Sequence, residues 1–442
     1  MPSSRLRTLA AHGALHTVSV TGLNIALSFA ITVLLARLLG PDAFGQYSFV
    51  YVVVLIASIP LTSGVRTLLM REVAVLSDQK NLARLSGLLR CSAYFWLGYC
   101  VSLILLPVLV RQALPGDWFG IPSRLYELAF LLLPAIAAIA ILSAIMIGLQ
   151  RVVLGQAVNL LFRPLILMIA LFSVWRVSPV WLTAELAIAL HVAAAFLAAL
   201  LALALMLRTL PKRAAPSRPE FDLPAWVRSI VPLTVNAAIG LIFTYTDIIM
   251  LGIFATTESV GQYRVATQGA LFVLLVMQAL NAFVSPKIAL HYARRELGQL
   301  DAFLSQYALF ALVPAAIVFA VFLVGGKDLL YLVFGMPYVT AWGALVLLSL
   351  GQLVNVATGF VGPVLNMTGH ERETVVGTTL SALINLVLNL VLIPPFGANG
   401  AAMATGASIV FWNIYLCWRA YRVTGLRTSP VWRAAALSRG GD

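Results

Sequence analysis

Three ionisable side chains lie deep in apolar stretches of this chain, and they are its best candidates for chemistry. Arg163 and His191 fall in the first half of the sequence, and Asp247 falls early in the second half. A charged group inside a bilayer costs about 3 kcal/mol or more, so it usually faces a cavity, a partner or a water-filled path. Each of these residues therefore has a functional interpretation, which must be weighed against a structural one.

Arg163 is the candidate for binding an anion. It lies 12 residues beyond Arg151, which is about 18 Å along a helix and close to the middle of a hydrocarbon core of about 30 Å. A guanidinium in a water-filled cleft can bind a diphosphate through paired hydrogen bonds. The alternative is a structural arginine that pairs with a neighbouring helix.

Asp247 and His191 are candidates for ion coupling. A carboxylate at position 247 could bind a coupling cation, exchange a proton, or form an internal salt bridge with a basic residue such as Arg37. His191 could relay protons, or it could be a histidine whose ring is simply satisfied in the core. The residue types alone leave these alternatives open for both residues.

The sequence contains no recognisable catalytic or metal-binding motif. Gly325-Gly326-Lys327 lacks the upstream glycine and the trailing Ser or Thr of a phosphate-binding loop, and no His-Glu-x-x-His occurs. The three cysteines, Cys91, Cys100 and Cys417, all fall in apolar segments, which predicts neither a disulfide nor a metal cluster. We therefore expect no enzyme activity, no cofactor and no bound metal.

The composition requires a membrane. Of the 442 residues, 61% are hydrophobic and only 10% are charged, whereas soluble domains carry about 25% charge. A span needs about 20 apolar residues, and twelve such segments can be found. They lie at about 15–38, 44–63, 91–112, 125–148, 152–174, 180–207, 229–254, 262–285, 303–324, 341–364, 375–394 and 400–420.

The positive charges indicate how these spans are oriented. With twelve spans, 22 of the 29 Lys and Arg residues fall on one side, six on the other, and Arg163 within a helix. Cytoplasmic loops carry the excess of basic residues, which predicts cytoplasmic N- and C-termini. The same rule accounts for the net charge of +13, so no nucleic-acid partner is expected.

The chain also repeats itself at about half its length. Residues 38–49 (LLGPDAFGQYSF) return in altered form at 254–265 (FATTESVGQYRV), an offset of 216. Two looser echoes follow in the same order: Gly148-x-x-Arg151 with Gly369-x-x-Arg372, and the basic, partly amphipathic segments 66–90 and 287–302, which we expect to be interfacial helices. Repeats of this kind indicate a duplicated unit.

We therefore predict an all-α integral membrane protein with two pseudo-symmetric six-helix lobes around a central cleft. The N-terminal lobe is 1–207, a basic proline-rich cytoplasmic linker is 208–228, the C-terminal lobe is 229–420, and a basic cytoplasmic tail is 421–442. Six helices per lobe give the two copies the same direction across the membrane, an arrangement known in transporters.

Two stretches carry a family resemblance. LLARLLGPDAFGQYSF at 34–49 resembles the first helix and outer turn of bacterial polysaccharide-export and O-antigen flippases, which belong to the multidrug/oligosaccharidyl-lipid/polysaccharide exporter superfamily. YTDIIMLGIF at 245–254 followed by VGQY at 260–263 is similar to that family's seventh helix and its outer turn. Topology, length and repeat agree over nearly the whole chain.

The resemblance implies a flippase that moves an undecaprenyl-diphosphate-linked oligosaccharide from the cytoplasmic to the periplasmic leaflet of the bacterial inner membrane. Arg163 would attract the diphosphate, with Arg37 or Arg264 assisting near the outer end. Asp247 matches a commonly acidic position of the family, which fits coupling to protons or sodium ions. A polysaccharide polymerase is a possible partner.

Three other functions stay open at this stage. A cation-coupled exporter of small drugs predicts an aromatic, acidic pocket. A peptidoglycan-precursor flippase usually has two further helices. A membrane glycan ligase or polymerase generally needs a large outer loop, and the longest outer connection here, 111–124, has about a dozen residues.

Overall fold

The computed structural model describes the whole chain except residues 1–2, 114–115, 178–181, 210–217, 427 and 430–442. Helices dominate the described residues, which contain no β-strand and one isolated bridge, between Trp118 and Ile121. The predicted all-α class is confirmed.

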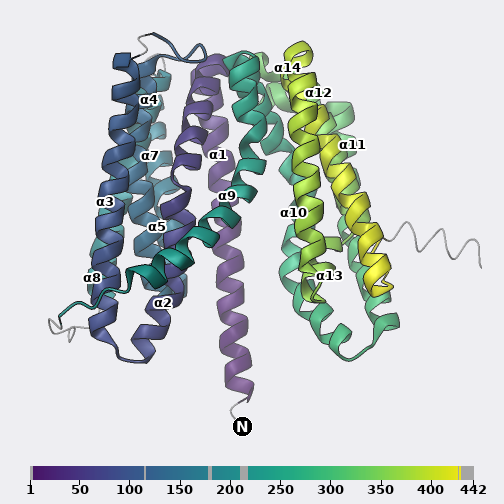
Figure 1. Cartoon of the computed structure of the whole chain (residues 1–442). Coiled ribbons are helices and arrows are strands. Elements are labelled where there is room, and N and C mark those ends of the chain that lie inside the picture. Colours follow the sequence, from purple (N-terminus) through teal and green to yellow (C-terminus); the bar gives the residue numbers. More distant parts are fainter. Residues whose placement is uncertain (1–2, 114–115, 178–181, 210–217, 427, 430–442) are drawn as a thin grey trace, which may run out of the picture. The chain divides into compact units, whose positions relative to one another are not determined.

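In chain order (Figure 1) the elements are α1 (Ser3–Ala57), η1 (Pro60–Val65), α2 (Arg66–Asp78), α3 (Leu82–Ala113), α4 (Ser123–Phe130), α5 (Leu132–Gly148), α6 (Val152–Ala157), η2 (Val158–Phe162), α7 (Arg163–Val177), α8 (Ala184–Thr209), α9 (Leu223–Phe254), α10 (Thr257–Ala293), α11 (Leu297–Phe334), η4 (Met336–Ala341), α12 (Trp342–Thr358), α13 (Val361–Met367) and α14 (Glu371–Thr424).

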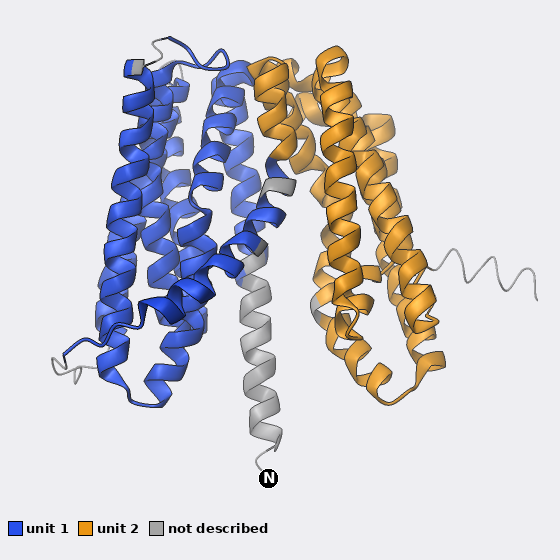
Figure 2. Cartoon of the chain, viewed as in Figure 1, with its two compact units in different colours: residues 1–245 blue, residues 246–442 orange. Residues whose placement is uncertain are grey.

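The chain forms two compact units, Met1–Tyr245 and Thr246–Asp442 (Figure 2). The boundary falls inside α9, which we predicted as the first helix of the C-terminal lobe. The lobe limits at 207 and 229, the linker 208–228, the tail 421–442 and the central cleft stay predictions. Residues 210–217 of that linker and 430–442 of that tail lie outside the described residues.

Nine helices in the described part of the chain are long and apolar enough to cross a membrane, and the bent pair Leu223–Leu241 and Thr244–Phe254, counted as one broken span, would make a tenth. Two of the nine, α1 and α14, have 55 and 54 residues, about 80 Å each, and therefore exceed twice the bilayer core. Gly40 (φ 72°) interrupts α1 and Gly397 (φ 52°) interrupts α14, in the left-handed region that glycine tolerates. Division at these glycines would give twelve spans, and that number stays a prediction.

The repeated motif has the same local geometry in both units. Gln46 Nε2 donates to Asp42 Oδ2 at 3.0 Å, and Gln262 Nε2 donates to Glu258 Oε1 at 3.0 Å. The tyrosine that follows each glutamine is buried in its own unit. This match supports the interpretation that residues 38–49 and 254–265 are two copies of one motif.

The segment after the second predicted span contains α2, which continues directly from η1 and packs its apolar face on α5. We predicted 66–90 and 287–302 as interfacial helices, and their position on the membrane surface stays a prediction. A Cβ added to Gly148 of α5 would lie 2.8 Å from Val73 Cβ. Residues 287–293 form the end of α10. An amphipathic pattern alone does not distinguish a protein surface from a membrane surface.

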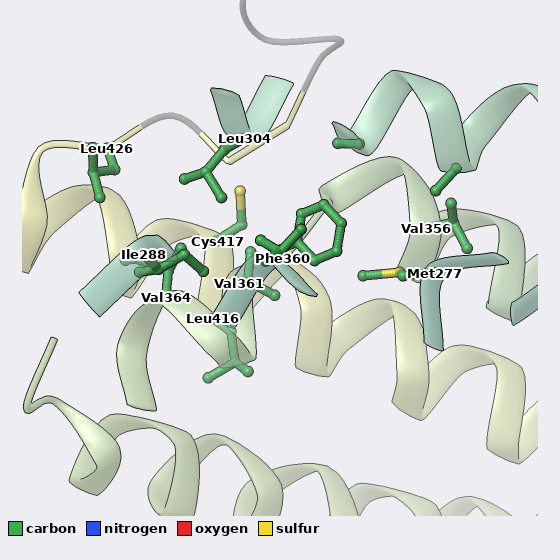
Figure 3. Close-up of a cluster of buried hydrophobic side chains, with 14 of the residues drawn as sticks. Met277, Ile288, Leu304, Val356, Phe360, Val361, Val364, Leu416, Cys417 and Leu426 are labelled. Carbon is green, nitrogen blue, oxygen red and sulfur yellow. The ribbon is translucent and has the colours of Figure 1, made fainter. Parts of the chain in front are cut away.

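Each unit has its own hydrophobic core. In the first unit, side chains of α5, η2 and α8 cluster around Met146 and Val158. In the second unit, Met277 of α10, Leu304 of α11, Val361 of α13 and Leu416 of α14 belong to a larger cluster (Figure 3). These cores hold the helices that present the polar residues described next.

Candidate functional site

The first unit contains a pocket of about 310 Å³ lined by polar and apolar side chains, within the size range of ligand sites. Residues of α1, η1, α2, α5, η2, α7 and α9 surround it. The lining residues are Asn24, Ser28, Leu55, Ser58, Thr62, Arg66, Ile136, Ile139, Ala140, Asn159, Leu160, Arg163, Pro164, Leu241 and Tyr245.

Two arginines and no carboxylate line this pocket. Arg163 was predicted as a site residue, and Arg66 was not. Among the described residues neither side chain has a carboxylate within ion-pairing distance. The Arg163 guanidinium lies 5.9 Å from the centre of the Tyr51 ring, and Arg66 Nε is buried without a hydrogen-bond partner. The pocket therefore carries uncompensated positive charge.

Arg66 lies outside the candidate spans. Burial lowers the pKa of its guanidinium, but an arginine stays protonated in proteins.

Local backbone geometry brings the two arginines to the pocket. η1 and η2 are π-helical turns, and each ends immediately before an arginine, Arg66 and Arg163 respectively. Pro60 at the first position of η1 has no N–H, so the regular α-helical pairing cannot continue through it. Leu61 N bonds three residues back, to Ser58 O at 3.1 Å, and Thr62 N bonds to the same oxygen at 2.9 Å.

His191 on α8 is buried close to this pocket. Its Nδ1 lies 2.7 Å from Tyr47 Oη, and its ring centre lies 5.0 Å from that of Tyr51. Because the Arg163 guanidinium also lies over the Tyr51 ring, the structure brings the predicted Arg163 and His191 to the same tyrosine. His191 thus has a hydrogen-bond partner and an arginine neighbour.

The second unit holds a buried carboxylate among neutral donors. Asp247 is 5% exposed. Its Oδ1 accepts from Asn385 Nδ2 at 3.1 Å and Asn389 Nδ2 at 2.6 Å. Its Oδ2 accepts from Tyr263 Oη at 2.5 Å and Thr405 Oγ1 at 2.6 Å.

No basic side chain among the described residues forms an ion pair with this carboxylate. The Oδ1 of Asn389 is buried without a partner. The cluster thus combines one negative charge with several neutral oxygens, a set that can hold a proton or a monovalent cation. In the described part of the chain, no three His, Cys, Asp or Glu side chains form a metal-binding group.

The two remaining predicted residues lie elsewhere. Arg37 is exposed on α1, and Arg264 is half-buried on α10 in the second unit. Neither lines the pocket.

Sequence reasoning missed Arg66, which we assigned to a cytoplasmic connection, and also missed the partners of Asp247. One signal for those partners was present, because Asn385 and Asn389 stand four residues apart in an apolar helix and so share one face.

Comparison with solved structures gives the fold a context. The lipid II flippase MurJ, in an inward closed conformation, matches with a TM-score of 0.67 and 12% identity over 92% of this chain and 87% of that chain. An inward-facing multidrug resistance MATE family transporter of the MOP superfamily matches with a TM-score of 0.68 and 10% identity over 97% of this chain and 100% of that one. Together with its apolar helices, this fold makes the chain a multi-pass membrane protein.

Sequence comparison gives a family. The chain is 27% identical over 177 residues to the probable low-salt glycan biosynthesis flippase Agl15 of Haloferax volcanii, and the match covers 39% of this chain and 37% of that protein. The chain thus matches little more than a third of this relative's length. The family described as "Polysaccharide biosynthesis protein" matches residues 10–289, which is more than half of the 442 residues. The chain therefore belongs to the polysaccharide biosynthesis protein family, as its sequence resemblance predicts.

Proposed function

We propose that this protein is a flippase for an oligosaccharide linked to undecaprenyl diphosphate, acting in cell-surface polysaccharide synthesis. The observation that supports this most directly is the pocket of the first unit. Its lining contains Arg66 and Arg163 and no acidic residue. An anionic headgroup is the ligand class that such a lining attracts.

A diphosphate suits two arginines better than a single phosphate does. Each guanidinium presents a planar set of N–H donors that can bind two phosphate oxygens at once. Asn24, Asn159 and Tyr245 add polar groups around the same space. The lipid tails would stay in the bilayer while the headgroup occupies the pocket, so the protein need only neutralise the charged part of its cargo.

The main alternative is a cation-coupled exporter of small drugs, a function suggested by the match to a multidrug resistance MATE family transporter. That match extends to the fold alone. A cationic drug would require acidic lining residues, whereas this pocket is positively charged. The charge of the lining therefore favours the anionic cargo.

We assign ion coupling to Asp247, with His191 as a second candidate. This buried carboxylate accepts hydrogen bonds from four neutral donors, so a bound proton or sodium ion is what would neutralise it. Ion binding there would remove a net charge from the interior and so favour a different packing of the second unit. This gives an ion gradient a way to drive the transport cycle.

The proposal includes a direction and a location. The two units, Met1–Tyr245 and Thr246–Asp442, would alternately expose the headgroup site to the cytoplasm and the periplasm. With both termini cytoplasmic, the cargo moves from the cytoplasmic to the periplasmic leaflet of the bacterial inner membrane. Arg37 and Arg264 would assist near the outer end, and a polymerase would then extend the exported glycan.

Charge reversal tests the proposal. Arg163→Glu in a deletion strain should abolish surface glycan while the protein still inserts in the membrane at normal abundance. The matched control is Arg176→Glu, an exposed residue on the same helix α7, which should export normally. Normal glycan export by Arg163→Glu would refute the assignment of this pocket to the cargo.

A further inference from the structure

Two π-helical turns flank the pocket, and each leads directly into one of its arginines. They are η1 before Arg66 and η2 before Arg163, and no other π-helical element is found in the described part of the chain. Well under 1% of residues in proteins are π-helical, and such turns occur often at functional sites. The presence of two π-helical turns at one pocket suggests that these turns position its two arginines.

The winding of η1 determines where Arg66 points. Ser58, Thr62 and Arg66 all line the pocket, and they stand four residues apart. An α-helix turns about 100° per residue, so Arg66 would lie about 80° around the axis from Ser58. A π turn, with its i to i+5 hydrogen bonds, holds more residues per turn and brings residues four apart closer to one face. Loss of the π turn would rotate Arg66 away from the pocket.

A side chain from a neighbouring helix stabilises this turn. Leu61 N, the normal α-helical partner of Ala57 O, bonds to Ser58 O instead. Tyr99 Oη of α3 donates to Ala57 O at 2.7 Å, which satisfies the carbonyl left free where the pairing changes just before η1. At the second turn, Ser143 Oγ of α5 donates at 2.8 Å to Gly155 O, three residues before η2.

We propose that Tyr99 is a positioning residue of the cationic pocket. By bonding the freed carbonyl of Ala57, its hydroxyl holds the π turn that keeps Thr62 and Arg66 on the pocket face. Ser143 has a related role for η2 and Arg163, because its hydroxyl bonds the Gly155 carbonyl that the Val158 N–H also bonds at the start of η2. The inference rests on the proposed function of the pocket as a diphosphate site.

Binding of farnesyl diphosphate to the full-length protein in lipid nanodiscs tests this inference, with farnesol as the uncharged comparison. Tyr99→Phe removes one hydroxyl and should weaken farnesyl diphosphate binding about five-fold, the typical net effect of one hydrogen bond, without affecting farnesol. Tyr94→Phe is the matched control, since Tyr94 lies on the same helix and is 68% exposed. Wild-type affinity in Tyr99→Phe would overturn the inference.

A double-mutant cycle separates positioning from general destabilisation. If Tyr99 acts through Arg66, Tyr99→Phe should cause no further loss of affinity in an Arg66→Gln background. An equal five-fold loss in both backgrounds would overturn the positioning role. Ser143→Ala, alone and with Arg163→Gln, provides the same test at η2 and serves if Tyr99→Phe does not fold.

The single arginine variants distinguish failure of the inference from failure of the proposed function. If Arg66→Gln and Arg163→Gln both bind farnesyl diphosphate like the wild type, the pocket is no diphosphate site. That result would refute both the proposed function and the positioning role of Tyr99. If both variants bind more weakly while Tyr99→Phe does not, only the positioning role is wrong.

Discussion

The Asp247 cluster gives the sharpest prediction, for the substitution Asp247→Asn. The carboxylate accepts four hydrogen bonds of 2.5 to 3.1 Å. An asparagine oxygen can keep the bonds from Asn385 and Asn389, and its amide can donate to the hydroxyls of Tyr263 and Thr405, which can turn to accept. The contacts therefore survive as neutral bonds.

The expected change in stability is small because two terms oppose each other. A hydrogen bond to a charged group contributes about 1.5–3 kcal/mol and a neutral one about 1 kcal/mol, so four bonds lose roughly 4 kcal/mol in total. Removing a buried charge returns several kcal/mol of desolvation free energy. We expect the free energy of unfolding without a coupling ion to change by less than about 2 kcal/mol.

Ion binding, by contrast, should disappear. A sodium ion at 100 times its Kd stabilises a protein by about 2.7 kcal/mol, and a proton would act in the same way as the pH falls. The assay is thermal unfolding of the purified full chain, with NaCl replaced by KCl at constant ionic strength and with pH varied. The wild type should gain several degrees in Tm with one of these ions, and Asp247→Asn should gain none.

The matched control is Asp42→Asn, an exposed carboxylate of the repeated motif, which should respond like the wild type. Equal stabilisation of wild type and Asp247→Asn by the ion would refute the assignment of the site. A wild type that responds to neither sodium nor pH would refute coupling through this carboxylate altogether.

Three further substitutions test the structure around the pocket and in the rest of the first unit. Arg163→Lys keeps the charge but loses the paired hydrogen bonds, so glycan export should fall about ten-fold; an unchanged export rate would mean that charge alone matters. In Gly87→Ala the new Cβ would lie 1.9 Å from the carbonyl oxygen of Glu220, just before α9, which should lower the free energy of unfolding by about 1–3 kcal/mol. Gly98→Ala places its Cβ in open space and should leave the Tm unchanged. Equal Tm values for the two variants would contradict this packing. Tyr47→Phe removes the 2.7 Å contact to His191 and should lower the free energy of unfolding by about 1–3 kcal/mol; no loss would mean that the histidine finds another partner.

The amino-acid sequence alone determined the class of protein and the outline of its helices. Apolar segments longer than a bilayer is thick allow only helices, because the backbone has no water to bond to. The predicted span limits placed breaks at 38–44 and 394–400, and the structure shows why: Gly40 and Gly397 lie there with a positive φ, which glycine reaches easily. Arg163 could be singled out because a lone charge in an apolar run is expensive whatever surrounds it.

Tertiary structure alone decided what these residues face. Arg66 joins Arg163 in the pocket because η1 winds as a π turn. Local sequence does not reveal that the hydroxyl of Tyr99, on another helix, holds this turn by bonding Ala57 O. Asp247 has neutral partners at positions 385, 389 and 405, more than 130 residues away in the chain. Hydropathy and charge patterns report the environment of one segment at a time, whereas a site is made where distant segments meet, and only their packing selects those neighbours.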